Sequence, residues 1–278
     1  MTAPVIDAAA IHPISLRLHT LENNLVLAPM AGVSNLPFRL IAREAGAAMG
    51  VSETISAKGL VMGGHKTRRL LIDLNVGCPV KKFIRNCAGS SLLRDLPRAV
   101  RIVSAMRQSF PGTFSVKMRT GWDDASIVAP EFARMCVDEG AELLSVHGRT
   151  RAQQYTGRAN RDVIREVVEA VPGTPVLANG DITRAADVFE MLRDTGAAGV
   201  MIGRGSVGNP WIFQQALELA QGGALRRPTP SERYTTIEQH IDLNVGCPVK
   251  KFIRNCAGSS LLRDLPRAVR IVSAMRQS

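Results

Sequence analysis

The sequence predicts an α/β protein of the (β/α)8 TIM-barrel type, in an incomplete or rearranged form. Short apolar runs alternate with amphipathic stretches along most of the chain, which is the pattern of strands alternating with helices. Six to eight such units in one domain favour a closed parallel barrel. Polar residues follow nearly every predicted strand, where barrel enzymes place their catalytic groups. An open, doubly wound sheet is the competing interpretation.

The predicted elements follow from hydrophobic periodicity. Expected strands are short apolar runs that end in small polar residues or glycine, at residues 25–28, 49–53, 72–76, 114–118, 143–147, 176–179, 199–202 and 241–245. Expected helices carry apolar residues at helical spacing, at residues 36–45, 96–107, 127–139, 161–170, 185–193, 210–220 and 265–276. We expect the helix at 210–220 to begin at Pro210, with Asn209 as its N-cap.

One segment occurs twice. Residues 72–109 are repeated without a substitution as residues 241–278. Each copy carries seven basic and two acidic residues, so the two copies supply +10 of the formal net charge of +11. Because the rest of the chain is nearly neutral, its basic composition is weak support for a nucleic-acid partner. A single perfect repeat, widely separated, is also unlike the diverged units of a solenoid.

Composition and absent motifs narrow the function. The 278 residues are 45% hydrophobic and 21% charged, which suits a large core and argues against disorder. The longest uncharged run, between Glu22 and Arg39, is too short to span a membrane, and no secretory signal pattern is present. Five cysteines without a CxxC pair argue against a disulfide scaffold or a zinc ribbon. We therefore expect a cytoplasmic protein with no metal site and no membrane segment.

Two neighbouring units end in glycine-containing turns that suit a phosphate. The sequence GRGSVGNPW begins at Gly203, and NGD begins at Asn179. Glycines allow close approach of backbone amides, helix N-termini attract anions, and Arg204 adds a cation. Barrel enzymes commonly bind phosphate on the loops after strands seven and eight. Either loop alone reads equally well as an ordinary turn, but together they favour a phosphate-bearing ligand.

Three side chains at the ends of other predicted strands could bind or polarise a ligand. Lys117 and Arg119 lie on one side of a predicted strand by its period of two, and Lys117 is expected to point into the barrel mouth. His147 ends the next predicted strand. The plainer alternatives are an ion-paired or solvated lysine and a hydrogen-bonded core histidine.

Cys78 comes just after a predicted strand, and Pro79 stops that strand from continuing. A single intracellular cysteine is more often a small buried apolar residue than a catalyst, and we expect Cys87 and Cys136 to be of that kind. No Walker, serine-elbow or HExxH motif is present. The combination of phosphate loops, lysine, histidine and thiol therefore predicts a phosphate-bearing cofactor.

Six ordered blocks give the chain a close resemblance to tRNA-dihydrouridine synthases, particularly the bacterial type. They are APMAGVSNLPFR (28–39), DLNVGCPVKK (73–82), VKMRTGWD (116–123), VHGRTRAQQYTG (146–157), ANGDI (178–182) and GRGSVGNPWIF (203–213). The resemblance implies an FMN-dependent barrel that reduces the C5=C6 bond of particular uridines in tRNA, with NADPH reducing the flavin. It also implies roles for individual residues.

By this resemblance, Cys78 is the general acid, because hydride addition at uracil C6 leaves enolate character that needs a proton at C5. A thiol with a reference pKa near ~8.5 is protonated at neutral pH and can supply it. The implied flavin contacts are Pro29, Met30 and Ala31 along the ring, Lys117 and His147 at its polar edge, and Asn179, Gly180, Asp181, Gly203 and Arg204 around the phosphate. The expected RNA contacts are Lys81, Lys82, Arg85, Arg149, Thr150 and Arg151.

The chain departs from the family pattern at two points. After residues 65–71 the family has a third strand, ending in a flavin-contacting glutamine, and a helix, whereas here the chain passes directly to Ile72. After residues 234–240 the family has a helical tRNA-binding domain, whereas here the second copy begins. We therefore expect residues 1–240 to form an FMN-binding barrel lacking one βα unit, in a monomer, with residues 241–278 replacing the helical domain.

Several alternatives stay open at this point. The copied strand at 241–245 would either close the barrel between the last and first strands or leave it open. The two departures would leave either an active or an impaired enzyme. The competing functions are another FMN-barrel oxidoreductase acting on a small molecule and a non-catalytic RNA-binding remnant, whose affinity would depend on salt.

Overall fold

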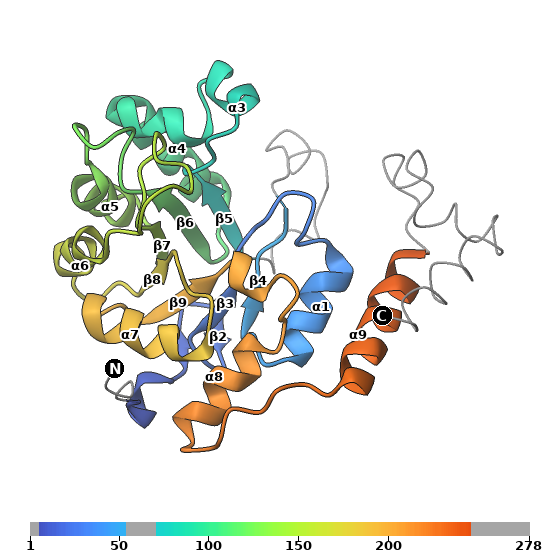
Figure 1. Ribbon diagram of the computed structural model, residues 1–278. Coiled ribbons are helices and arrows are strands. Elements are labelled where there is room, and N and C mark those ends of the chain that lie inside the picture. The colour runs from blue at the N-terminus through green and yellow to red at the C-terminus, as the bar shows by residue number, and fades with distance from the viewer. Residues whose placement is uncertain (1–5, 54–70, 246–278) are drawn as a thin grey trace.

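The computed structural model describes residues 6–53 and 71–245, without the side chains of 81–82 and 241–245. Its centre is a curled sheet of seven parallel strands in the spatial order β4-β3-β9-β8-β7-β6-β5. Helices cover the outer face of the sheet (Figure 1). The strands are β3 (Leu25–Leu27), β4 (Met49–Gly50), β5 (Ile72–Asn75), β6 (Phe114–Arg119), β7 (Leu143–His147), β8 (Val176–Asn179) and β9 (Gly199–Ile202).

The curled sheet is an incomplete (β/α)8 barrel, as predicted. The last strand pairs directly with the first, with Val26 opposite Met201. No position is therefore left between them for a further strand, and that route to closure, through the copied strand, is wrong. Within the described residues, the sheet instead ends at β4 on one side and β5 on the other. The break thus falls between β4 and β5, the part of the chain where the sequence analysis expects one βα unit to be missing.

Most helices begin and end at residues whose chemistry explains the boundary. Asn35, Asp95 and Asn160 each accept a hydrogen bond from a backbone N–H two or three residues further on, which caps α1, α4 and α6. Gly196 ends α7 in the left-handed region, at φ 66°. The helices are α1 (Leu36–Glu44), α3 (Lys81–Arg85), α4 (Leu96–Ser109), α5 (Ala129–Asp138), α6 (Arg161–Ala170), α7 (Ala185–Thr195), α8 (Ile212–Ala220) and α9 (Pro230–Val245).

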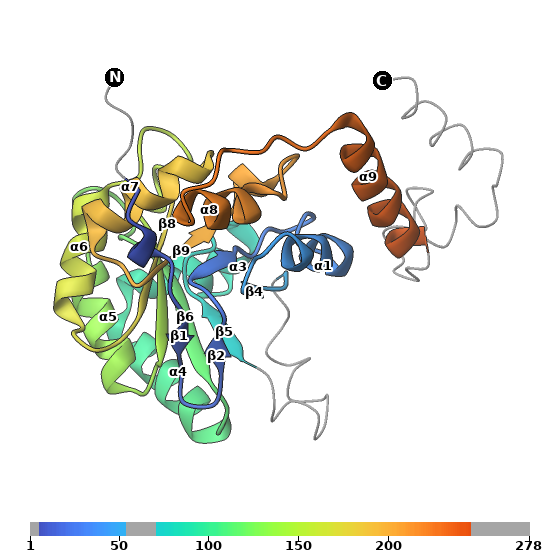
Figure 2. The same cartoon turned by 90° about the horizontal axis from the view of Figure 1, so that it is seen from below.

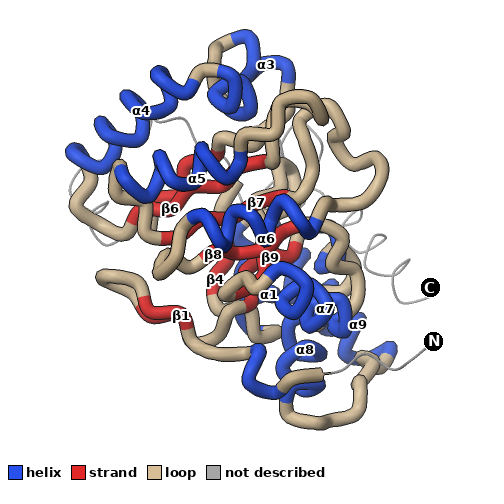
Figure 3. Tube along the Cα trace, turned by 90° about the vertical axis from the view of Figure 1, so that its left-hand side faces the viewer, coloured by secondary structure: helices blue, strands red, loops and turns tan. Residues whose placement is uncertain are grey.

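Two apolar clusters hold these layers together. The larger lies between the sheet and its helices, which follow one another around the outside (Figure 3), and it includes Phe114, Phe132 and Phe213. The smaller lies inside the curl of the sheet, where Leu177 packs with side chains of the N-terminal hairpin β1 (Ile14–Ser15) and β2 (Thr20–Leu21). Since apolar residues fill this part of the interior, the open space lies at the carboxyl ends of the strands.

Two expected elements are corrected at the C-terminal side. The expected strand at 241–245 is instead the last turn of α9. This helix lies against α1 (Figure 2), where Gln239 donates to Glu44 over 2.7 Å and the rings of His240 and Phe38 are 6.3 Å apart. Helix α8 begins at Ile212 rather than Pro210, and its N-cap residue is Trp211. The expected helix at 265–276 lies outside the described residues.

Candidate active site

A cavity of about 850 Å³ opens at the carboxyl ends of the strands. This volume lies within the roughly 300–1,000 Å³ typical of cofactor and ligand sites. The cavity collects residues from the ends of six strands that are far apart in the sequence. Its lining includes every predicted flavin contact and the predicted acid, namely Pro29, Met30, Ala31, Cys78, Lys117, His147, Asn179, Gly180, Asp181, Gly203 and Arg204.

Lys117 points from β6 into this cavity, as its flanking apolar residues predicted. The ammonium donates to Oδ1 of Asn179 over 3.2 Å, and Asn179 in turn donates to the carbonyl of Met201 over 2.6 Å. Burial lowers the pKa of Lys117 to about 8, an effect that Asp73 opposes and Arg119 reinforces. The lysine is therefore a cation near neutral pH that a modest change in its surroundings would discharge.

His147, at the end of β7, is a neutral imidazole in this setting. Burial lowers its pKa to about 2, and the positive charges of Lys117, Arg119, Arg149 and Arg204 act in the same direction. A neutral ring can donate one hydrogen bond and accept another, but it holds no proton that it could release at pH 7. The arrangement therefore suits His147 as a hydrogen-bonding contact rather than as a general acid.

Arg149 is buried, with 2% of its surface exposed, although the sequence suggested an RNA contact. Its guanidinium pairs with Asp181 at 2.8 Å and donates to the carbonyls of Thr156 at 3.0 Å and Gly157 at 2.7 Å. It therefore braces the loop after β7 against the end of β8. A direct contact of Arg149 with RNA stays a prediction.

Arg119 also braces the loop after β7. Its Nε donates to the carbonyl of Gly77 over 3.1 Å, directly before Cys78. Its Nη1 donates to the carbonyls of Thr150 and Gln154, at 2.8 and 2.9 Å. One buried side chain thus fixes both the cysteine-bearing turn and the loop that faces it.

Cys78 lies partly buried in the turn after β5. Its carbonyl accepts from both the N–H and the hydroxyl of Ser90, at 3.1 and 3.0 Å. A Cβ on Gly89 would stand 2.7 Å from that carbonyl oxygen, so only glycine fits there. These contacts hold the thiol at the rim of the cavity.

Of the two cysteines that were expected to be buried, one is buried and the other is exposed. Cys136 is fully buried on α5, as predicted, and burial raises its pKa to about 12. The expectation for Cys87 is wrong, because Cys87 is exposed. Its backbone adopts φ 50° in the turn after α3. Cys247 and Cys256 lie outside the described residues.

The two predicted phosphate loops meet at one end of the cavity. Gly180 has φ 127°, and a Cβ there would stand 2.6 Å from the Cβ of Ala159, so both conformation and space require glycine. The carboxylate of Asp181 points to Arg149 and to the N–H of Ala159, at 2.7 Å. Although burial opposes ionisation, these two partners hold the pKa of Asp181 below its usual range.

After β9 the chain makes a short 3₁₀ turn, Arg204–Ser206, instead of entering a helix at once. The expected N-cap role of Asn209 is therefore wrong, and its amide donates to Gln215 instead. What remains of the predicted anion site is the pair of glycine loops and Arg204, whose guanidinium is 3.5 Å from Asp181.

Sequence reasoning gave no role to Tyr155, which lines the cavity from the loop after β7. The guanidinium of Arg204 lies 4.5 Å from its ring centroid and that of Arg119 lies 5.6 Å away. The chain has only two tyrosines. The position of one of them in a loop that follows a predicted strand, close to basic residues, is the sequence feature that could have suggested a role for Tyr155.

Thr150, another predicted RNA contact, is buried with 1% of its surface exposed, and neither it nor Arg151 is among the residues that line the cavity. Arg151 stacks on Trp122, with its guanidinium carbon 4.4 Å from the ring centroid. Arg94 also contacts that ring, at 4.8 Å. The backbone of Lys81 and Lys82 forms the first turn of α3, directly after the cysteine turn. The structure thus brings the predicted flavin contacts together around one cavity, and α3 begins at the edge of that cavity, where Val80 is a lining residue.

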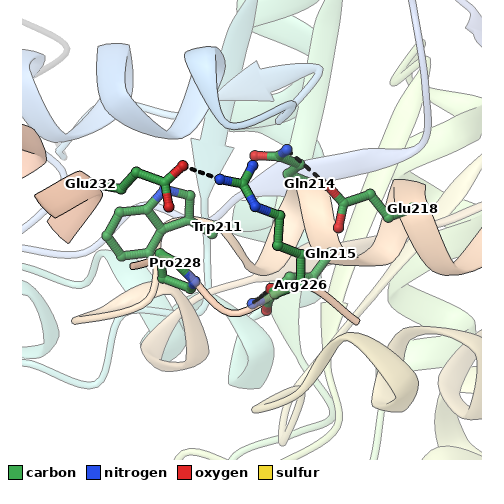
Figure 4. Close-up of a pocket in the computed structure, with 7 residues that line it drawn as sticks. All are labelled: Trp211, Gln214, Gln215, Glu218, Arg226, Pro228 and Glu232. Carbon is green, nitrogen blue, oxygen red and sulfur yellow. Dashed lines mark hydrogen bonds and ion pairs between the residues drawn. The ribbon is translucent and has the colours of Figure 1, made fainter. Parts of the chain in front are cut away.

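A second, smaller cavity of about 40 Å³ lies between α8 and the start of α9 (Figure 4). Its polar side chains already pair with one another. Gln214 donates to Glu218 over 2.8 Å, and Arg226 pairs with Glu232. This cavity has room for only a few water molecules, and its side chains connect the two helices.

The fold and the large cavity together define an α/β barrel protein with a cationic ligand site at the carboxyl ends of its strands. The family model for "Dihydrouridine synthase (Dus)" matches residues 68–241 and, separately, residues 234–278. The chain belongs to the dihydrouridine synthase family. Within the described residues, no helix is long and apolar enough to cross a membrane.

Curated relatives agree with this assignment over most of the chain. A probable tRNA-dihydrouridine synthase of Rickettsia prowazekii is 36% identical over 275 positions, covering 83% of this chain and 84% of the relative. The tRNA-dihydrouridine synthase B of Pseudomonas putida is 36% identical and covers 80% and 77%. That of Xanthomonas campestris is 38% identical and covers 81% and 78%.

Solved structures of low sequence identity share the fold. An (S)-mandelate dehydrogenase mutant superposes with a TM-score of 0.51 at 16% identity, covering 80% of each chain. A mandelate oxidase superposes with a TM-score of 0.51 at 21% identity, covering 80% of this chain and 79% of the other. These similarities support the barrel architecture alone.

Proposed function

We propose that this protein is a flavin-dependent tRNA-dihydrouridine synthase, which binds FMN in the large cavity and reduces uridine in tRNA to 5,6-dihydrouridine. One observation carries the proposal. The residues that the family resemblance assigns to the flavin, together with Cys78, come from separate units of the chain and line a single cavity. Family membership and relatives bearing this name support the same reaction.

The residues fit FMN at both of its chemically distinct ends. Gly180 and Gly203 leave backbone space at one end of the cavity, where Arg204 offers a positive charge to a phosphate. Lys117 and His147 offer one cation and one neutral ring to the flavin's polar edge. Pro29, Met30 and Ala31 supply an apolar wall for the ring. Bound there, FMN supplies the hydride that reduces uracil, and we assign the renewal of that hydride to NADPH.

Cys78 is the group we assign to protonate C5 of the uracil after hydride has reached C6. The turn that carries it is fixed by Ser90 on one side and by Arg119 through Gly77 on the other. A rigid turn keeps the thiol at one place on the rim, which a proton donor requires. The protonated thiol loses its proton to carbon, and the resulting thiolate regains one from solvent.

We assign the substrate RNA to the rim formed by α3 and the loop after β7, through Lys81, Lys82 and Arg151, with Arg149 as the buried member. Contacts of this kind are mainly to phosphates, so affinity should fall steeply with salt. We further propose a cytoplasmic monomer whose FMN-binding unit is residues 1–240, followed by residues 241–278 as a second copy of residues 72–109.

The first test is an absorbance spectrum of the purified protein, before and after heat release of any bound cofactor. We expect flavin bands and released FMN, with weakened binding because one flavin-contacting unit is missing. A colourless, folded protein that takes up no added FMN would overturn the proposal. Mass spectrometry of tRNA after incubation with NADPH then distinguishes this function from its alternatives. Turnover of free uridine or an enone, but not of tRNA, would identify a small-molecule oxidoreductase.

A further inference from the structure

The place on β6 that residues 72–109 occupy is defined here as the β6 slot. Four residues of β5 pair in parallel with β6, from Ile72 opposite Phe114 to Asn75 opposite Lys117. The carboxylate of Asp73 accepts from Ser115 over 2.8 Å. Beyond the strand, the segment buries Val76, Leu92, Leu93, Ala99 and Val103, each at most 5% exposed.

The chain holds two segments that fit this slot and has only one slot on β6. Residues 241–278 repeat every side chain of residues 72–109 at an offset of 169. The apolar positions reappear as Val245, Leu261, Leu262, Ala268 and Val272. Any contact that the first copy makes with β6, α5 or the loops is therefore chemically available to the second copy.

We propose that residues 241–278 of one molecule can fill the β6 slot of another molecule, so that this segment is an exchangeable spare for residues 72–109. The occupant comes from a second molecule because the segment starts with no linker. Gln239 and His240 are packed on α1, and residues 241–245 continue the same helix. Reaching the slot of its own molecule would require α9 to leave α1, whereas two separate molecules can take any relative position.

The first copy, residues 72–109, is the resident of the β6 slot. It occupies the slot because a short stretch of chain joins it to β6, since the two identical copies would pack there equally well. Four residues separate its last helix residue, Ser109, from the first residue of β6. So short a link gives the resident a local concentration on the order of millimolar, well above that of a second molecule in dilute solution. Exchange is therefore rare in the unaltered protein, and it becomes dominant when the resident copy is damaged or the protein is concentrated. This is the usual logic of domain swapping.

Entry of the second copy changes the structure of its first five residues from helix to strand. These residues are the C-terminal turn of α9, and terminal turns of helices open readily. In the slot they gain the four pairings with β6 that the resident strand makes. In that arrangement Cys247 takes the place of Cys78 at the rim of the cavity.

A disulfide trap tests the exchange directly and does not depend on the proposed enzyme activity. Cysteines replace Ser115 and Asp242, whose counterpart Asp73 is directly opposite Ser115 in the sheet. The pair Ser115→Cys and Asp73→Cys is the positive control and should give a monomeric cross-link. Ser115→Cys alone measures the background from the five native cysteines. We expect the trap to give a disulfide-linked dimer at high protein concentration, identified by the 115–242 cross-linked peptide.

A second experiment introduces a disruptive substitution into one copy at a time. Leu93→Asp places a charge at a buried position, and Leu262→Asp makes the same change in the second copy. We expect Leu93→Asp to stay folded with a melting temperature that rises with protein concentration, and to give at least tenfold more 115–242 dimer. Leu262→Asp should behave as the unaltered chain, and the double variant should lose its fold. The proposal fails if Leu93→Asp is as disrupted as the double variant, or if no 115–242 cross-link forms in it.

Discussion

Residues 72–76 and 241–245 have the same five side chains and different structures. Ile72–Asn75 is a strand of the sheet, paired along its length with β6. The residues from Ile241 to Val245 end a helix that packs on α1. The five residues contain no proline, which would disfavour one of the two conformations. The difference therefore comes from what precedes and follows each copy along the chain.

The first copy ends four residues before β6, and each of the four residues of its strand β5 pairs with a residue of β6. The second copy follows eleven residues that already form a helix from Pro230, so helix propagation costs it little. Local propensity is weak enough for the five residues to follow their context in both cases. Anything that depends on the first copy's place beside β6 should therefore be absent from the second.

The largest expected difference is in catalysis. Cys78→Ala should lower dihydrouridine formation by about 100-fold to 10,000-fold, since it removes the general acid at the rim. Cys247→Ala should leave the rate within a small factor. Flavin content should be the same in both variants, because a proton donor does not hold the cofactor. The measurement is mass spectrometry of dihydrouridine in tRNA under single-turnover conditions, and equal loss in both variants would contradict the assignment of Cys78.

The next largest difference between the two copies should be in how much each contributes to the free energy of unfolding. Leu92 is buried, with 4% of its surface exposed, and packs in the main apolar cluster. Leu92→Ala should lower the free energy of unfolding by about 2–5 kcal/mol, through lost burial and the cavity that remains. Leu261→Ala, its matched control, should change that free energy by no more than about 0.5 kcal/mol. Urea unfolding followed by circular dichroism measures both, and a comparable loss in Leu261→Ala would show that the second copy is also packed in a core.

Much of this arrangement could be predicted from the sequence. The strands at Leu143–His147, Val176–Asn179 and Gly199–Ile202 and the helix Arg161–Ala170 have the predicted boundaries. Central parallel strands are buried on both faces, so their apolar runs are unbroken and their ends are sharp. The polar residues that follow them were predicted to share one edge, and Lys117, His147 and Asn179 do line one cavity.

The failures have a common physical cause, which is that tertiary contacts decide them. The strand expected at 241–245 lost its position because β3 and β9 pair directly. The burial of Arg149 depends on a carboxylate 32 residues away in the sequence, which no local pattern reveals. Tyr155 reaches the cavity because two arginines fix its loop. Each of these depends on groups that are distant in the chain and adjacent in space.

A smaller effect should appear in the titration of Lys117. Burial lowers the pKa of this lysine to about 8, and the carboxylate of Asp73 acts to raise it. Asp73→Asn should therefore move the pKa below about 8, whereas Asp242→Asn should leave it unchanged. Selective labelling of lysine Cε and an NMR titration give the midpoint. A shift in the Asp242→Asn variant would place the second carboxylate near Lys117 as well.

The lowered pKa of Lys117 also predicts how the free energy of unfolding changes with pH. Its folded-state pKa of about 8 lies below the usual value of 10.5, so between these pH values the unfolded chain binds more protons than the folded one. The contribution of Lys117 to the free energy of unfolding should therefore rise as the pH increases from about 8 to about 10.5. Lys117→Met should flatten that rise, and urea unfolding over this pH range would detect it.

Removal of the second copy should have the smallest effect on the folded unit. A chain that stops at Val245 keeps all of α9 and every strand of the sheet. We expect it to melt within a few degrees of the full chain and to bind FMN equally well, because the resident copy already occupies the β6 slot. The deletion also removes seven basic residues and one acidic residue, so weak RNA binding should lose part of its salt dependence. Aggregation of the shortened chain, or loss of its flavin, would mean that residues 246–278 support the barrel, and Cys247 would then have to be tested again as a catalytic residue.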